Sequence, residues 1–454
     1  MPSRYDSGHV SAQPLAQPLE LHRSNRIPKN RIIKGPTAET MAAWDPKQRF
    51  VSGIPNEKHT QLYRRLAEGN WDMIVTGNIH VDFNFIIRPG DLCISPECPM
   101  DGERFIMFQK LAAEAKANGS LFIGQLNHCG RQILVGMGHE PISASSVQLP
   151  TAEGMVYAQP RSATKRDITR VIEQFADAAT YLEKAGFDSV ELHGAHGYLI
   201  SQFLARDTNL RTDEYGAQTE ENRLRFLNDI CAAIKKRVST RFIIGVKIST
   251  VEFQDGGITA EDSRSVCIRL DKASMDYVQL SGGNYQDFGM RWDNGSTQKQ
   301  EAYFLKSAQM AMGGLVNRNI KAFLSGGLRS VGNMVKALDL VDGVVLSRPA
   351  IHEPRLAEDI LMGRVPGALR PLSVLEDDAM LGVMLTHSKI RQIAAGNDPL
   401  DDSDPAVFTH WRKDMEKWLQ KVQQGDDLMV FSGVVEYTGP MFPYGTRRAQ
   451  ELNL

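Results

Sequence analysis

The strongest constraint on the fold of this chain is a regular alternation of two kinds of segment. Short apolar runs rich in β-branched residues recur eight times, separated by longer stretches with helical spacing. The apolar runs are residues 31–35, 73–76, 121–125, 189–193, 242–248, 277–280, 321–324 and 343–346. Helical spacing is seen at 57–68, 103–118, 168–185, 222–237 and 331–338. Eight successive βα units predict an α/β fold, a (β/α)8 TIM barrel.

The apolar runs turn polar near their C-terminal ends. Gln125, His193 and Lys247 stand at or near the ends of their strands, and Ser281 directly follows another strand. Buried parallel strands are otherwise nearly continuous apolar runs. Since the C-terminal ends of the strands form the catalytic face of a (β/α)8 barrel, we expect these four side chains at the site of chemistry.

The chain divides into three parts. Residues 1–25 are polar and contain proline, which predicts a flexible segment, and residues 26–365 are expected to form the barrel. A Gly/Pro/Arg stretch leads into residues 366–454, for which we expect a mainly helical C-terminal extension. Within it, residues 411–422 place apolar side chains on one helical face. We expect this face to pack on the barrel or on a second subunit of a homo-oligomer.

Composition narrows the functional classes. Lys and Arg number 52 against 54 Asp and Glu, a net charge of −2 that gives no electrostatic case for nucleic acid or an anionic membrane. The five cysteines contain no C-x-x-C pair, so we predict neither a disulfide framework nor a metal site. The chain has no long apolar segment and no secretory signal, so a cytoplasmic location is expected.

Residues 190–223 carry the most specific pattern, VELHGAHGYLISQFLARDTNLRTDEYGAQTEENR. It resembles the Old Yellow Enzyme family of FMN-dependent ene-reductases. In that family the fourth strand ends in His-x-x-(His or Asn)-x-Tyr, followed by Gln-Phe-Leu, an Arg-Thr-Asp-Glu-Tyr-Gly loop and Glu-Asn-Arg. His193, His196 and Tyr198 fill the three positions of the first motif. The resemblance extends from about Asn30 to Leu361. It implies FMN as the cofactor and NAD(P)H as the reductant.

The resemblance assigns chemistry to these three residues. Reduction of an activated C=C bond builds negative charge on the carbonyl oxygen of the acceptor, and two side-chain donors stabilise that charge. His193 and His196 suit this role, and His193 also counts among the flavin-binding residues. The phenol of Tyr198 is then the general acid that protonates the α-carbon.

The same resemblance implies residues that bind the flavin ring. Gln125 ends strand three in a Gln-Leu-x-His-x-Gly-Arg stretch, and its carboxamide matches the pyrimidine edge, which has both donors and acceptors. Lys247 stands where the family usually has an arginine facing flavin N1, so the cation is kept without the planar fork. A lysine at a strand end can also be read as a Schiff-base nucleophile, an interpretation that the flavin motifs around it disfavour.

Two further regions complete the expected cofactor site. Gly326 and Gly327 follow strand seven, while Ser347 and Arg348 follow strand eight, the loops that commonly bind phosphate in such barrels. After strand one, the turn of residues 36–38 consists of Pro36, Thr37 and Ala38. Ala38 stands where the family often offers a Thr, Ser or Cys to the flavin, and the adjacent Thr37 is a candidate substitute.

The sequence therefore predicts an FMN-dependent enzyme that uses NAD(P)H to reduce α,β-unsaturated carbonyl compounds by hydride transfer from flavin N5. A flavin-dependent demethylase or oxidase on the same barrel remains an alternative, because function lies in the loops. A flavin-binding scaffold without turnover is the alternative from another class, and the departures at Ala38 and Lys247 are its only support in the sequence.

Overall fold

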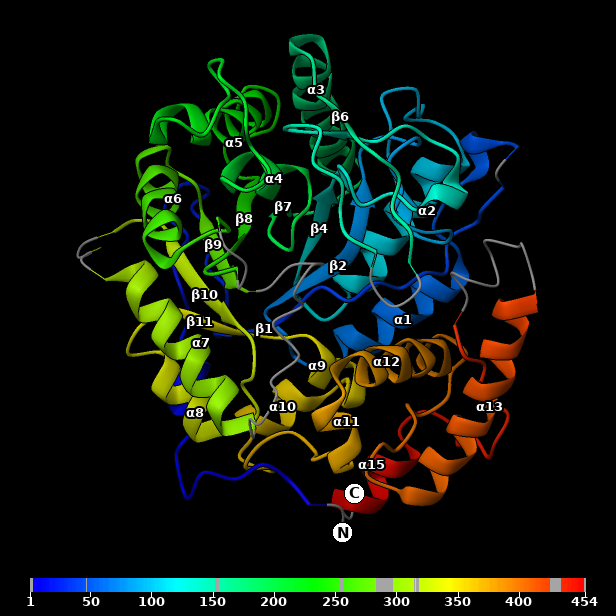
Figure 1. The fold of residues 1–454 in the computed structure, drawn as a ribbon. Coiled ribbons are helices and arrows are strands. Elements are labelled where there is room, and N and C mark those ends of the chain that lie inside the picture. Colours follow the sequence, from blue (N-terminus) through cyan, green and yellow to red (C-terminus); the bar gives the residue numbers. More distant parts are fainter. Residues whose placement is uncertain are drawn as a thin grey trace.

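The computed structural model describes residues 3–45, 47–151, 155–252, 256–282, 297–313, 315, 318–424 and 434–452. Its centre is a closed parallel barrel (Figure 1). The barrel strands are β1 (Ile32–Lys34), β2 (Met73–His80), β4 (Leu121–Asn127), β7 (Ser189–Gly194), β8 (Ile243–Ser249), β9 (Tyr277–Ser281), β10 (Lys321–Ser325) and β11 (Gly343–Leu346). Pairing of β1 with both β2 and β11 closes the barrel. The predicted (β/α)8 fold and all eight predicted strands are confirmed.

Helices surround the barrel between its strands (Figure 1). The five predicted stretches correspond to α1 (Glu57–Ala67), α2 (Glu103–Ala115), α3 (Lys165–Lys184), α5 (Glu220–Lys235) and α8 (Val331–Ala337). The structure adds α4 (Leu199–Leu204), α6 (Ala260–Lys272), α7 (Thr297–Met312), α9 (Arg348–His352) and α10 (Leu356–Leu361). Reciprocal capping boxes at Asn56, Thr164 and Thr259 begin α1, α3 and α6, because each cap satisfies otherwise unpaired N–H groups.

Short elements lie in the connections between the main helices and strands. The two-residue strand β3 (Leu92–Cys93) pairs in parallel with the C-terminal end of β2, and β5 (Ile142–Ser143) pairs with β6 (Arg161–Ser162) after β4. Single 3-10 turns occur at η1 (Gln13–Ala16), η2 (Arg49–Val51) and η3 (Val135–Met137).

The interior of the barrel is lined by alternate residues of each strand, as the two-residue period of a strand requires. Its apolar cluster consists of Leu19, Leu21, Ile33, Met73, Val75, Ile123, Ile243, Tyr277, Phe323 and Val345. All the strand members of this cluster have odd numbers. Gln125, His193 and Lys247 also have odd numbers, so their polar side chains point into the same interior, above the apolar layer.

The N-terminal segment differs from the flexible tail that its composition suggested. Leu15 and Leu21 are fully buried and Leu19 nearly so. Leu19 and Leu21 belong to the interior cluster of the barrel, and the backbone N–H of Leu21 donates to the Arg26 carbonyl at 2.8 Å. An open barrel end would expose apolar side chains to water, and burying leucines there offsets the entropy of ordering the segment.

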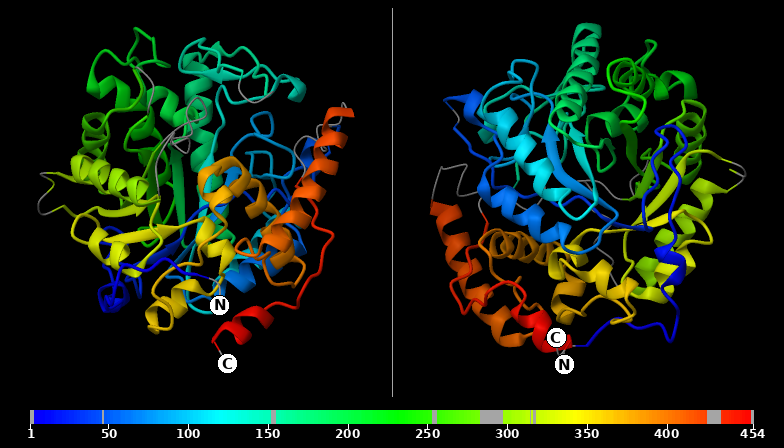
Figure 2. Two further views of the ribbon diagram at one scale, coloured as in Figure 1. Left: turned by 60° about the horizontal axis from the view of Figure 1, so that its bottom comes forward. Right: turned by 180° about the vertical axis from the view of Figure 1, so that it is seen from behind.

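The extension consists of α11 (Ser373–Asp377), α12 (Ala379–Ala394), α13 (Pro405–Gln424) and α15 (Thr446–Leu452), which lie along one side of the barrel (Figure 2). Helix α12 packs on α1, and Ile390 and Ile393 join the main core. The predicted helix at residues 411–422 lies within α13. Its Trp411 is fully buried in a cluster made by the extension itself and donates to Ser388 Oγ at 2.9 Å. Among the described helices, none has the length and apolar character needed to cross a membrane.

A buried carboxylate links this extension to the barrel. Asp402 Oδ2 lies 2.7 Å from Lys389 Nζ on α12 and 3.0 Å from His352 Nδ1 on α9. Burial alone would raise the pKa of Asp402, but His352 and Lys389 more than offset it and hold that pKa well below its ordinary value. Asp402 is therefore ionised in the folded protein.

Asp402→Asn should lower the free energy of unfolding by about 3 kcal/mol, because it leaves the Lys389 ammonium buried without its counter-charge. The loss should appear in urea denaturation near neutral pH. Since the folded pKa of Asp402 is depressed, its stabilisation is present above the ordinary value of about 3.9 and disappears as the pH falls through the folded pKa. The half-exposed neighbour Asp401 provides the control, and an equal loss in Asp401→Asn would contradict the assignment.

Candidate active site

Three of the expected residues meet at the C-terminal end of the barrel interior. Gln125, His193 and Lys247 come from the adjacent strands β4, β7 and β8 and are 2%, 4% and 5% exposed. The register places His193 opposite Lys247 and Gln125 opposite Glu191. The strand-end polarity that the sequence indicated is therefore a spatial cluster.

His193, His196 and Tyr198 form one compact group after β7. The ring centroid of His193 lies 5.0 Å from that of His196 and 4.5 Å from that of Tyr198, both edge to face. His196 and Gly197 have φ values of 57° and 72°, the left-handed region. These two residues reverse the chain and return Tyr198, the N-cap of α4, to the face of His193.

Both imidazoles are held neutral. Burial lowers the pKa of each well below its ordinary value, and Lys247 lowers both further. The backbone N–H of Ala195 donates to His193 Nδ1 at 3.4 Å, which leaves the ring proton on Nε2 as a donor. His196 Nε2 lies 3.0 Å from Ser281 Oγ, so the strand-end serine identified in the sequence orients the second ring.

The loops beside this group are fastened by residues of the sequence motif. Gln202 Nε2 donates to the Gly197 carbonyl at 2.7 Å and to the Cys129 carbonyl at 3.3 Å, which joins the loops after β7 and β4. His128 accepts from the Gly130 N–H at 3.1 Å and so holds its own turn. The Cys129 thiol donates to a backbone carbonyl, and burial raises its pKa well above the ordinary value. Such a thiol is a poor nucleophile.

Glu191 is a polar member of the site that the sequence reasoning missed. It is fully buried on β7, and its Oε1 accepts from Gln125 Nε2 at 2.8 Å. Burial lowers the pKa of Lys247 to about 8, and the charge of Glu191 opposes that effect. The signal was present in the sequence, because a carboxylate inside the apolar run Ser189–Gly194 requires partners.

Gln279 is a second missed residue. It lies on β9 opposite Lys247 and is 1% exposed, yet its Nε2 has no hydrogen-bond partner among the described residues. An unpaired buried amide is costly, so a ligand with acceptor atoms suits this position. Together with Gln125 and Lys247 it forms a donor set that fits the polar edge of an isoalloxazine ring.

Hydrogen bonds to neighbouring residues hold the turn after β1. Thr37 Oγ1 accepts from Lys34 Nζ at 3.1 Å, so the hydroxyl proton is what Thr37 can offer to a ligand. The neighbouring Glu39 is buried and accepts from the Gly77 N–H at 2.8 Å. Pro36, Thr37 and Ala38 are half-buried at the end of β1, where the sequence placed the flavin turn.

The expected phosphate residues lie in the loops after β10 and β11. Gly326 and Gly327 have φ values of 126° and 70°, and a Cβ on Gly326 would come within 2.8 Å of the Phe304 ring. Ser347 stands so close to β1 that a Cβ on Gly35 would lie 2.4 Å from its hydroxyl oxygen. Crowding by side chains at Gly35 and Gly326, and the positive φ of Gly326 and Gly327, favour glycine at these positions.

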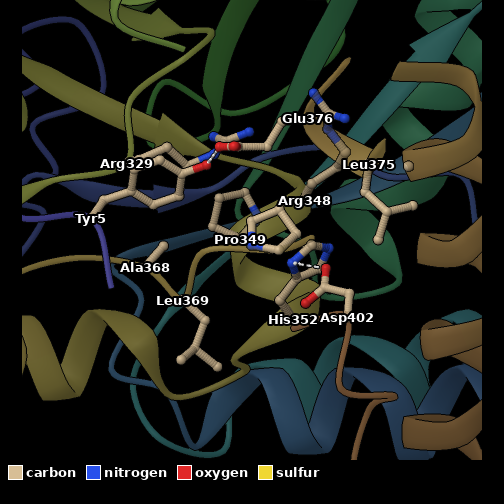
Figure 3. A pocket seen from close by; sticks show the side chains of 12 residues that line it. Tyr5, Arg329, Arg348, Pro349, His352, Ala368, Leu369, Leu375, Glu376 and Asp402 are labelled. Atoms are coloured by element: carbon tan, nitrogen blue, oxygen red, sulfur yellow. Dashed lines mark hydrogen bonds and ion pairs between the residues drawn. The ribbon is translucent and has the colours of Figure 1, made fainter. Parts of the chain in front are cut away.

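Arg348 points into a cavity beneath the extension (Figure 3). The cavity is lined by Tyr5, Arg329, Arg348, Pro349, His352, Ala368, Leu369, Pro371, Leu375, Glu376, Gly382 and Asp402. Burial and the neighbouring Arg329 lower the pKa of Arg348 to about 10, with Asp402 opposing. Two carboxylates, Glu376 and Asp402, line the same cavity, so its lining carries both signs of charge. The cavity lies beside the β11 loop rather than among His193, His196 and Tyr198.

Known proteins are similar to most of this chain. The model of the NADH:flavin oxidoreductase / NADH oxidase family matches residues 14–364. The NADH-dependent flavin oxidoreductase nadA of Aspergillus parasiticus is 42% identical over 416 residues, 91% of this chain and 93% of the relative. The NADPH dehydrogenase of Clostridium acetobutylicum is 34% identical over 260 residues, 57% of this chain and 71% of the relative.

Solved structures share the fold. Morphinone reductase in complex with tetrahydroNAD has a TM-score of 0.62 at 21% identity, covering 79% of this chain and 93% of its own. The 2-naphthoyl-CoA reductase complex has a TM-score of 0.69 at 22% identity, covering 78% of this chain and 53% of its own.

Proposed function

Because the chain belongs to the NADH:flavin oxidoreductase / NADH oxidase family, that of the Old Yellow Enzyme, we propose that it reduces the activated C=C bond of α,β-unsaturated carbonyl compounds at His193, His196 and Tyr198. It is a flavin oxidoreductase with FMN as its cofactor and NAD(P)H as its reductant. The observation that carries the proposal is the group of two neutral imidazoles and one phenol, in which the rings of His196 and Tyr198 lie 5.0 and 4.5 Å from that of His193.

The three side chains divide the work on the acceptor. FMN, when bound, would supply hydride-transfer chemistry, with NAD(P)H as the reductant. His193 donates from Nε2 to the acceptor oxygen, and His196 is placed beside it as the second donor, so charge that develops on that oxygen is stabilised. Tyr198 delivers a proton to the α-carbon, and a fixed phenol suits this step because it is a weak acid that stays protonated at neutral pH.

Other residues would hold the cofactor. Gln125 and Gln279 offer amide groups to the polar edge of the ring, and Lys247 provides the positive charge beside it. Thr37 can donate its hydroxyl proton from the β1 turn. Gly326, Gly327, Ser347 and Arg348 would bind the phosphate, a role supported by their place in the loops after β10 and β11.

The visible absorption spectrum of the purified protein tests the proposal. We expect bound FMN that bleaches on anaerobic addition of NADH or NADPH and recovers its colour when cyclohexenone is added. Recovery with oxygen but not with cyclohexenone would favour the oxidase alternative. A protein that fails to bind added FMN would contradict the proposal and favour the scaffold.

A further inference from the structure

Glu191 occupies the centre of the polar layer inside the barrel. Its Oε1 accepts from Gln125 Nε2 at 2.8 Å, and its Oε2 accepts from the Tyr277 hydroxyl at 3.3 Å. Gly245 makes room for this arrangement, because a Cβ there would lie 2.0 Å from the Tyr277 ring. Burial raises the pKa of Glu191, while the charge of Lys247 and the two hydrogen-bond donors oppose that effect and favour the ionised carboxylate.

The contact to Gln125 fixes the direction of its amide. A carboxylate oxygen only accepts hydrogen bonds, so the amide nitrogen of Gln125 must face Glu191. The carbonyl oxygen and the second N–H of Gln125 then remain for another partner. One acceptor beside one donor matches the N–H and C=O pattern along the pyrimidine edge of a flavin.

Glu191 also adjusts the charge that Lys247 presents. The two residues lie on the neighbouring strands β7 and β8, and both are buried in the barrel interior. The negative charge of Glu191 partly cancels the field of the ammonium group, and it opposes the lowering of the Lys247 pKa by burial. Without Glu191, a protonated Lys247 would act on a bound ring with a larger positive field, at a pH well below its pKa of about 8.

We propose that Glu191 is a positioning residue that sets both the orientation of Gln125 and the net charge of Lys247 toward the pyrimidine edge of FMN. This inference rests on the proposed function, since it requires the flavin ring to lie against Gln125 and Lys247. It adds a buried carboxylate, two positions before the first histidine of the motif, to the residues that govern the cofactor.

Glu191→Gln tests the proposal, with FMN affinity and flavin reduction potential as readouts besides activity. We expect the dissociation constant of FMN to rise tenfold or more, because the new amide lets Gln125 turn over. At pH 6, below the Lys247 pKa of about 8, the potential should become more positive, since a protonated Lys247 without Glu191 favours the reduced anion. A tenfold preference for the reduced form corresponds to about 30 mV for two electrons. Glu191→Asp keeps the negative charge, but its shorter side chain no longer reaches Gln125. It should therefore weaken FMN binding while the potential stays near that of the wild type.

Asp276→Asn provides the matched control. Asp276 is also a buried carboxylate with an arginine partner, Arg23 at 3.1 Å, but it lies at the opposite end of β9. It should lower stability in urea without moving the potential. If Glu191→Gln behaves in the same way, Glu191 is structural and the proposal is overturned. Gln125→Ala and Lys247→Ala separate this outcome from a failure of the proposed function. If neither changes FMN affinity or potential, the flavin lies elsewhere and both proposals fall.

Discussion

Tyr198→Phe should slow the reduction of an unsaturated ketone by about 10² to 10⁴-fold, the usual contribution of a positioned general acid. Reduction of the flavin by NAD(P)H should be unchanged, because that half-reaction needs no proton from Tyr198. The aromatic ring stays in place and keeps its edge-to-face contact with His193, so the substitution removes little besides the hydroxyl group. Stopped-flow measurement of the two half-reactions separates the effects.

Tyr181→Phe is the control for this prediction. Tyr181 is 1% exposed on α3, where its ring packs against Phe105 and Phe108 outside the barrel. Its variant should leave both half-reactions at the wild-type rate. Equal losses in the two half-reactions of Tyr198→Phe would contradict the role of proton donor.

The double replacement of His193 and His196 by Ala is expected to have an effect of similar size. Removing one donor from an oxyanion site costs roughly 10² to 10³ in rate, so removal of both should nearly abolish acceptor reduction. Phenols that mimic the enolate should also bind much more weakly, because transition-state mimics use the same donors. Titration of the flavin spectrum with a phenol measures this loss directly.

The exposed His139 supplies the control for the double variant, since its replacement by Ala removes an imidazole from the protein surface. Unchanged phenol affinity in the double variant would refute the oxyanion role. Because the pKa values of His193 and His196 are both lowered, the two rings stay neutral across the neutral range. Phenol binding should therefore show no loss from titration of these histidines between about pH 6 and 8.

The sequence was sufficient for the barrel because buried parallel strands are apolar almost throughout and helices repeat every 3.6 residues. His193, His196 and Tyr198 could be named because they fall within one short motif, and a local turn brings them together. Gln125 and Lys247 were found from their strand-end positions, where the topology gathers side chains from distant parts of the chain.

The remaining features depend on tertiary contacts that local patterns do not encode. Gln279 faces inward only because β9 is in register with β8, and its residue type alone fits a surface strand equally well. Leu19 and Leu21 lie in a polar stretch, and their burial follows from the open barrel end that they fill. The path of the extension could not be predicted from the sequence either, because Asp402 contacts Lys389 and His352 only once α12 lies against the barrel.

The left-handed backbone at His196 restricts how this enzyme can diversify. At φ 57°, asparagine, aspartate and histidine are the side chains tolerated best, whereas β-branched residues are strained. Evolution or a library that varies residue 196 can therefore exchange one hydrogen-bonding group for another, as the family's His-or-Asn pattern does. It cannot easily install valine, isoleucine or threonine there. Mutational searches for activity on new acceptor substrates should keep a polar residue at position 196 and vary the surrounding loops instead.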